Sequence, residues 1–348
     1  MKTLTLICLL LLCVPDLTPQ SRQKSEGYGR QAGRELRQAN DGPVRGPLLG
    51  FVSLQEDGVR PIRGIPGAAS LGPAIAGIPE FRAAALSSLN GFLLGVRAVD
   101  DRLVLICGLG RREQLAGLPV IASGVSLLVL SPSERTAAIY DRPASRITVL
   151  KGLPDDPKVS WSAALDALPG ELAALAVRDD GGEAMAAAGG SLITVARGGD
   201  WRHIASVDGA VRLSYLNDSS DAVYVDAGRK RMHLLRRSEG GISVIPLAGE
   251  ADGLAAPEAL ALSRDNRRAF VANSDPAQVL VVDLRTGLIE STPCSCAVTG
   301  VTPLAGNAVF QISSTKNQAV CVFDGTRSEP RLSYIPPPLE VSRMGGVR

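Results

Sequence analysis

Five segments of the chain repeat one pattern of short apolar runs and turns. Four copies align without a gap, beginning at Ala84, Leu128, Leu213 and Leu260, and a fifth, beginning at Leu175, aligns after one residue is deleted. One set of equivalent positions, in chain order, is Ser87, Ser131, Arg178, Leu216 and Ser263. The spacings between successive members of this set are 44, 47, 38 and 47 residues. A chain with a period of roughly 40–50 residues builds its core by stacking copies of one unit. The repeat therefore restricts the fold to such an architecture.

The copy over 257–294 indicates what each unit contains. Its apolar runs predict four short strands with tight turns between them: Leu260–Leu262, Ala269–Ala272, Val279–Leu284 and Leu288–Ser291. Four such strands make one sheet, which cannot bury both of its faces alone, so each unit must pack against its neighbours. We therefore expect an all-β fold, a β-propeller of about seven four-stranded antiparallel blades.

The ends of the repeat region bear on the blade count and on how the ring closes. A degenerate copy occupies 300–336, and a start with only two or three strands is predicted over 48–64. Counts of six and eight blades stay open. Because the first unit lacks strands, we expect the two ends of the chain to complete one blade together, which would remove an exposed sheet edge.

One copy carries residues that resemble a known repeat. A predicted strand ends in Phe270-Val271-Ala272-Asn273, and the next ends in Asp283-Leu284-Arg285-Thr286-Gly287. This run is similar to the YVTN-type repeat of quinoprotein-like β-propellers, and Phe323-Asp324-Gly325-Thr326 echoes its second half. Relatives with this architecture include surface-layer proteins, lactonase-like enzymes and the haem-d1 domain of nitrite reductases. The resemblance implies a propeller fold and an exported, bacterial type of protein, but no single activity.

The segments outside the repeats predict export. Residues 1–20 are typical of a signal peptide, with one lysine and then roughly a dozen apolar residues, too few to cross a bilayer. Residues 21–45 are polar and arginine-rich, which predicts a disordered basic spacer. The propeller is expected over 46–338, and a flexible tail over 339–348. We expect a secreted or periplasmic, envelope-associated protein with no transmembrane segment once the leader is removed.

Composition argues against nucleic acid as a partner. The formal net charge is +2 and only 4% of the residues are aromatic, so the chain lacks both the basic excess and the stacking side chains that nucleic acid binding uses. The expected partners are another envelope protein or a glycan, and the expected state is a monomer.

Polar residues recur at two positions of the repeat. Asp141, Asp226 and Asn273 follow the second strand of their copies, so a propeller would place them on one rim. They are candidates for a cation site, although each can instead cap its own loop, which is the interpretation we favour. Arg146 and Arg231 coincide near the third strand and are candidates for an anion-binding patch; the alternative is a solvated hairpin.

Three cysteines are unusually placed. Cys294 and Cys296 are separated by one residue, and Cys321 falls in the next blade. Because exported proteins tend to oxidise their thiols, we expect a structural disulfide between Cys294 and Cys296, or between one of them and Cys321. Buried thiols and a metal or redox role are the alternatives. No histidine lies nearby to complete the four ligands of zinc, so we expect no metal and no cofactor.

Catalysis finds little support in the sequence. The chain has two histidines, His203 and His233, and it lacks a G-x-S-x-G elbow, an H-E-x-x-H motif and a glycine-rich phosphate loop. We expect a non-catalytic binding or interaction scaffold that uses one rim or the central funnel. The alternative is a lactonase- or lyase-like enzyme, for which His203, Glu258 and loop arginines would have to converge on the funnel.

Overall fold

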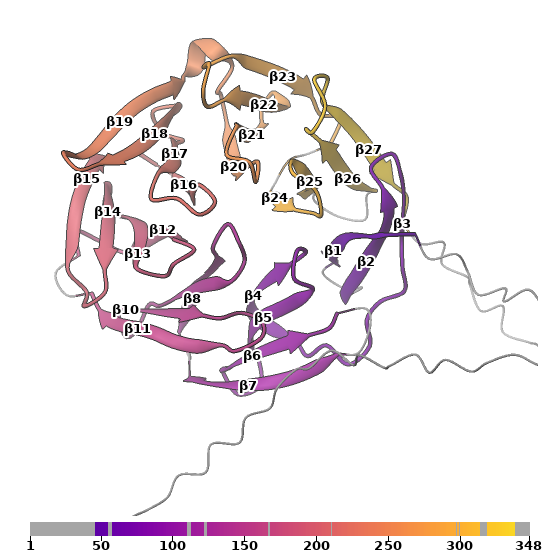
Figure 1. The fold of residues 1–348 in the computed structure, drawn as a ribbon, viewed down its shortest axis with the longest axis horizontal. Helices are drawn as coiled ribbons and strands as arrows, with labels where there is room; N and C mark the ends of the chain where they lie inside the picture. Colours follow the sequence, from indigo (N-terminus) through magenta and orange to yellow (C-terminus); the bar gives the residue numbers. More distant parts are fainter. Residues whose placement is uncertain are drawn as a thin grey trace, which may run out of the picture. The chain divides into compact units, whose positions relative to one another are not determined.

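The computed structural model describes residues 46–337, except 55–57, 110–112, 122–123, 166–167, 210, 297, 299 and 314–318. In this part of the chain, strands that follow one another in sequence pair antiparallel into seven sheets. The sheets form a ring, with the first strand of each nearest the centre (Figure 1). The fold is a seven-bladed β-propeller. The predicted leader, spacer and tail lie outside the described residues.

The first blade has three strands and the other six have four. The strands of the first four blades are β1 (Leu48–Leu54), β2 (Gly58–Ile65) and β3 (Ala68–Leu71); β4 (Phe81–Ser87), β5 (Phe92–Arg97), β6 (Arg102–Cys107) and β7 (Gln114–Ile121); β8 (Val125–Leu130), β9 (Thr136–Asp141), β10 (Arg146–Lys151) and β11 (Lys158–Ala164); β12 (Leu172–Val177), β13 (Glu183–Ala188), β14 (Ser191–Ala196) and β15 (Trp201–Ser206).

The last three blades follow the same plan. Their strands are β16 (Val211–Tyr215), β17 (Ala222–Asp226), β18 (Arg231–Ser238) and β19 (Gly241–Ala248); β20 (Pro257–Leu262), β21 (Arg268–Ser274), β22 (Ala277–Asp283) and β23 (Ile289–Pro293); β24 (Gly300–Pro303), β25 (Val309–Ser313), β26 (Val320–Asp324) and β27 (Arg331–Ile335). A short 3₁₀ helix, Glu250–Asp252, joins blades 5 and 6. Among the described residues, no helix is long and apolar enough to cross a lipid bilayer.

The repeat copies coincide with the blades. The five copies found in the sequence are blades 2 to 6, the degenerate copy over 300–336 is blade 7, and the short start over 48–64 belongs to blade 1. The four strands predicted within 257–294 overlap β20, β21, β22 and β23, with bounds that differ by at most three residues. The sequence prediction of about seven blades is confirmed.

Apolar packing between neighbouring blades forms the core. The buried side chains of the described residues group into seven clusters, and each cluster lies between two adjacent blades. Because neighbouring blades cover both faces of each sheet, the second strand of a blade can be buried completely. In β17, the second strand of blade 5, every residue is buried. A sheet covered on both faces needs a nearly continuous apolar run rather than an alternating one, which explains the Ala- and Val-rich second runs of the repeat.

The ring closes differently from the sequence-based expectation. Among the described strands, each of the seven sheets is built from one continuous stretch of chain, so the expected blade shared by the two ends is wrong. Blades 1 and 7 instead meet face to face. Their interface contains Leu49, Ile62 and Val322, and the Ala305 N–H donates to the Leu49 carbonyl at 2.7 Å. Apolar contact takes the place of strand pairing.

We predict that Phe270→Ala destabilises the propeller by about 3–5 kcal/mol, the usual cost of removing a fully buried aromatic ring. Phe270 is completely buried, and its ring contacts Phe310 at 4.8 Å and Phe323 at 5.7 Å between ring centroids. Urea unfolding followed by tryptophan fluorescence measures the change. Leu288→Ala is the control, since Leu288 is 61% exposed and should change stability by less than about 0.5 kcal/mol. Equal effects of the two variants would contradict the interface.

Candidate functional site

A cavity of about 360 Å³ lies at the centre of the propeller. Its walls are the first strands of blades 2 to 7, which are β4, β8, β12, β16, β20 and β24, together with the loops that follow them. Cavities of this size bind small molecules or single groups of a larger partner. The cavity is therefore the first candidate for a binding site.

Most of the lining is aliphatic. Leu128, Leu175, Leu213 and Leu260 all contribute to it, and these four residues occupy one position of the sequence repeat. The aliphatic lining residues are Ala85, Leu86, Leu89, Leu128, Val129, Leu130, Leu175, Ala176, Val177, Leu213, Leu260, Ala261, Leu262, Val301, Leu304 and Val309. Since the repeat places the same apolar run on the inner strand of each blade, the apolar wall is a direct product of duplication.

Polar groups gather at one end of the cavity. Glu134, Asn217, Arg264 and Asn307 line it from loops that connect the first and second strands of their blades. Inner strands of a propeller run in the same direction, so these loops share one rim. The cavity thus has an aliphatic body and a rim that carries one carboxyl group, one guanidinium group and two amides.

Glu134 is the most unusual residue of this rim. Only 5% of it is exposed; its carboxylate accepts hydrogen bonds from the Ser87 hydroxyl and, at 3.1 Å, from the Leu89 N–H, both in blade 2. Burial raises the pKa of this carboxyl above its usual value, although these bonds and the charge of Arg264 oppose the rise.

The backbone of Glu134 also departs from the ordinary. Its φ is 58°, and the aligned residues Gly181 and Asn266 have φ of 62° and 58°. This left-handed region suits glycine and tolerates asparagine, whereas other side chains carry a cost on the order of 1 kcal/mol there. Alignment of the copies could have found Glu134 from the sequence, since three of the other four copies have Gly or Asn at its position. Our sequence analysis missed it.

Arg264 lies on the same rim. Its Nη2 donates to the Leu304 carbonyl of blade 7 at 2.8 Å. Burial lowers the pKa of the guanidinium, and the neighbouring Glu134 carboxylate opposes that change. The Arg264 side chain therefore does two things: it bonds to the next blade, and its guanidinium borders the cavity. Arg264 was also missed by sequence analysis, and no motif marks it.

Hydrogen bonds between the rim loops join one blade to the next. Asp179 of blade 4 accepts from the Ser133 N–H of blade 3 at 2.8 Å and from the Asp218 N–H of blade 5 at 2.7 Å. Asn266 of blade 6 exchanges two bonds with the backbone of Asn217 in blade 5, at 2.8 and 2.9 Å. Much of the polar chemistry of this rim therefore fixes neighbouring blades in register.

The candidate residues Asp141, Asp226 and Asn273 lie at the ends of second strands, on the rim opposite to Glu134. Asp141 and Asp226 make local bonds, accepting from the Ala144 N–H at 3.3 Å and from the Arg229 N–H at 3.0 Å. The Asn273 amide instead donates at 2.9 Å to the carbonyl of Gly253, in the linker that precedes its blade. None of these three residues is among the described residues that line the cavity. Asp141 and Asp226 thus have the geometry of loop caps, whereas Asn273 ties its strand to the preceding linker and has a buried Oδ1 with no hydrogen-bond partner among the described residues. The three residues lie at the ends of strands in blades 3, 5 and 6, and the cation hypothesis gains no further support.

The candidate arginines start third strands in two different blades. Arg146 is exposed and its Nη1 lies 3.5 Å from the Ser162 hydroxyl. Arg231 borders a separate groove that also contains His233 and Asp252. At the start of β18, Arg231 is exposed whereas the next residue, Met232, is fully buried. The two arginines therefore lie in different blades, at the start of the third strands of blades 3 and 5, and blade 4 separates them.

Neither histidine contributes to the lining of the cavity. His203 lies on β15, the outermost strand of blade 4. His233 lies on β18, where its ring stacks on Tyr224 with centroids 4.8 Å apart. Burial lowers the pKa of His233, and the charge of Arg231 lowers it further. The convergence of His203 with acidic and arginine side chains that the enzyme alternative requires is therefore not observed.

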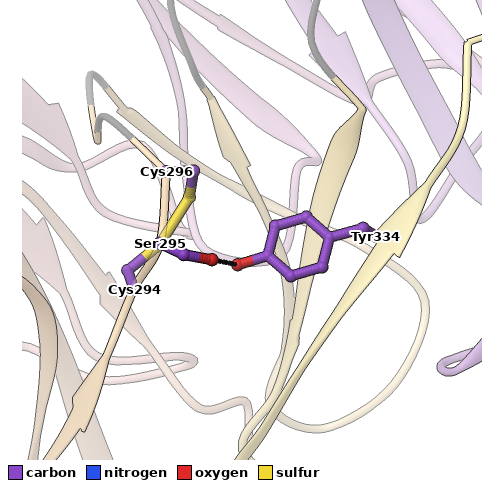
Figure 2. The surroundings of a disulfide bond; sticks show 4 residues. All are labelled: Cys294, Ser295, Cys296 and Tyr334. Atoms are coloured by element: carbon purple, nitrogen blue, oxygen red, sulfur yellow. Dashed lines mark hydrogen bonds between the residues drawn. A yellow bond between two sulfur atoms is a disulfide. The ribbon is translucent and has the colours of Figure 1, made fainter.

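Cys294, Cys296 and Cys321 lie in the interface between blades 6 and 7 rather than at the cavity. The structure joins Cys294 and Cys296, which follow β23, in a disulfide (Figure 2). Cys321 of β26 is fully buried and lies outside this bond. Burial raises the pKa of its thiol to about 11, while a hydrogen bond with Tyr334 opposes the rise. Of the two pairings that the sequence left open, the structure has the local one.

Comparison with known proteins supports the fold alone. No family model and no curated protein matches the chain. A functionally unknown protein from Desulfotomaculum acetoxidans DSM 771 is similar in structure, with a TM-score of 0.59 at 11% identity over 84% of this chain and 100% of that one. A putative 6-phosphogluconolactonase from Bacteroides fragilis NCTC 9343 has a TM-score of 0.57 at 13% identity over 83% and 92%.

A third solved structure gives the same result. A protein from Lactobacillus plantarum has a TM-score of 0.58 at 10% identity, over 83% of this chain and 96% of that one. At such low identities the likeness extends to the propeller architecture, and the activity of a neighbour does not transfer with it.

We predict that Glu134→Gln changes how stability depends on pH. A carboxyl group whose pKa is raised by folding stabilises the protein fully below its unfolded value of about 4.5, and this stabilisation is lost as pH rises through the folded-state value. Glutamine keeps an acceptor oxygen but does not ionise. Relative to the wild type, the variant should therefore gain stability as pH rises above about 4.5.

Urea unfolding at a series of pH values, compared with the exposed control Glu239→Gln, measures this difference. A Glu134→Gln curve parallel to that of the wild type throughout would show that the buried carboxyl is not titrating as described.

Proposed function

We propose that the chain is an exported, non-catalytic binding scaffold whose central cavity accepts an apolar group of its ligand. One observation carries this proposal: the cavity wall is largely aliphatic, and the two charged groups among its described lining residues, Glu134 and Arg264, already bond to neighbouring blades. An enclosed apolar space with few polar groups at one end is the usual form of a binding pocket.

The same observation argues against catalysis at this site. General acid–base chemistry needs a titratable group within hydrogen-bond reach of the substrate and free to exchange a proton. Glu134 is held by Ser87 and Leu89, and both histidines lie outside the cavity. Hydrogen bonds that fix the rim loops thus occupy the groups that an enzyme would use.

The aliphatic wall also favours one of the two expected partner classes. A glycan presents many hydroxyl groups, and along this wall they would lose hydrogen bonds to water without replacement. A protein that inserts an apolar side chain loses none. We therefore propose an envelope protein as the partner, with the rim around Glu134 as the side from which it enters.

The remaining parts of the proposal rest on sequence. The apolar leader over 1–20 supports a secreted or periplasmic location, and the run from Phe270 to Gly287 supports membership of the YVTN-type propeller repeats. Both features suit an envelope-associated protein, and a monomer stays part of the proposal.

Titration of the folded protein with 1-anilinonaphthalene-8-sulfonate, an apolar dye with an anionic group, tests the cavity. We expect saturable binding of one dye per chain, and at least tenfold weaker binding in Leu128→Trp, whose indole would fill the cavity. Leu288→Trp is the matched control, because Leu288 is exposed on the β22–β23 turn. Circular dichroism verifies that both variants fold.

Two results would overturn the proposal. One is dye binding that is absent or equally strong in Leu128→Trp. The other is hydrolysis of 6-phosphogluconolactone above background that Glu134→Gln abolishes, since turnover through that carboxyl would make the cavity an active site.

A further inference from the structure

A cluster of three sulfur atoms lies between blades 6 and 7, away from the central cavity. The Sγ atoms of Cys294, Cys296 and Cys321 are all within 4.8 Å of one another, and all three residues are buried. Among the described His, Cys, Asp and Glu side chains, this is the one group of three or more whose ligand atoms are close enough to share a metal ion.

A stabilising role does not account for this arrangement. The entropic benefit of a disulfide grows with the length of the loop that it closes, and the bond between Cys294 and Cys296 spans a separation of two residues. A bond from either residue to Cys321 would close a loop more than ten times as long and would link two blades. The chain holds the shorter bond and keeps a third sulfur beside it, which points to chemistry at the sulfur atoms.

The surroundings of the cluster leave it shielded but close to the surface. The Ser295 and Tyr334 hydroxyls are 2.5 Å apart and lie beside the disulfide (Figure 2). Tyr334 is 45% exposed and belongs to β27, the outermost strand of blade 7. Cys294 and Cys296 are themselves 7% and 6% exposed, whereas Cys321 is fully buried. Small ions and reductants can therefore reach the cluster from the side of the disulfide.

The donor set selects the class of ion. Three thiolates without imidazole or carboxylate favour a soft ion such as copper(I), whereas structural zinc takes four ligands and hard cations take oxygen. With metal–sulfur bonds of about 2.3 Å, three sulfurs around one ion in a plane are roughly 4.0 Å apart. That separation lies within the 4.8 Å limit of the cluster, so small side-chain movements suffice.

We propose that Cys294, Cys296 and Cys321 form a copper(I) site that opens when the Cys294–Cys296 disulfide is reduced. A dithiol supplies two electrons and two protons, the S–S bond breaks into two thiols, and the dithiol becomes a disulfide. Copper(I) then binds the three sulfurs and displaces one proton from each, without a change in its oxidation state. The oxidised chain offers the ion one sulfur in place of three.

Copper(I) titration of the full-length protein tests the site. The protein is reduced with an excess of a phosphine, which contains no thiol, and titrated without oxygen against a chromophoric copper(I) chelator. We expect one tightly bound ion per chain in the reduced protein and none of that affinity in the oxidised protein. Cys8→Ser with Cys13→Ser removes the two cysteines that precede the described residues and should leave this ion bound.

Variants identify the ligands. Cys294→Ser, Cys296→Ser and Cys321→Ser should each weaken binding by more than about 100-fold, since loss of a ligand exceeds the roughly 10–100-fold cost of losing a group that supports one. Cys107→Ser, in blade 2, should have no effect. Thermal unfolding adds a second measurement: copper(I) should raise the midpoint of the wild type but not of Cys321→Ser.

The sulfur count around the ion decides the case even if a variant fails to fold. X-ray absorption of the wild-type complex should show three sulfur neighbours. Two sulfur neighbours, undiminished binding in Cys321→Ser, equal binding by the oxidised protein, or no tight binding would each overturn the proposal. None of these readouts involves the central cavity, so the copper site and the proposed binding function can fail independently.

Discussion

Apolar contact between adjacent blades is the interaction on which the rest of this structure depends. Each blade is a single sheet without a core of its own, and each of the seven buried clusters belongs to two blades at once. A blade is therefore stable only when both neighbours are present. The hydrogen bonds of the rim loops, such as those of Asp179, refine the alignment of blades that the apolar contacts have already brought together.

This dependence explains the character of the centre. Inner strands must supply apolar side chains to both interfaces, so the space that they surround inherits an aliphatic wall. Among the described lining residues, the charged groups come from loops, where Glu134 and Arg264 take part in contacts between blades. A protein built in this way gains a shielded apolar site without dedicated residues, whereas an active site would need extra functional groups added to the same wall.

The repeat made most of the fold predictable, because a period of one blade and four apolar runs per copy leave few alternatives. The inner run beginning at Leu128 and Leu260 even marks the cavity wall. Closure could not be predicted, because the short first unit is equally consistent with a three-stranded blade and with a shared one. Glu134 was missed because its importance lies in backbone conformation and burial. The sequence offered Cys321 as a partner of Cys294 or Cys296, but which pair bonds depends on how the two blades pack, which spacing in the sequence does not reveal.

The way in which the ring closes has a consequence for how its blades can part. Of the seven interfaces between the described blades, the one between blades 7 and 1 is spanned by no peptide linkage, and it is held by the cluster around Leu49 and Val322 and by hydrogen bonds such as that of Ala305. Parting these two blades breaks no strand pairing and stretches no connecting loop. Among the described blades, this seam is therefore where the ring can part with the fewest covalent constraints, while every individual sheet stays intact.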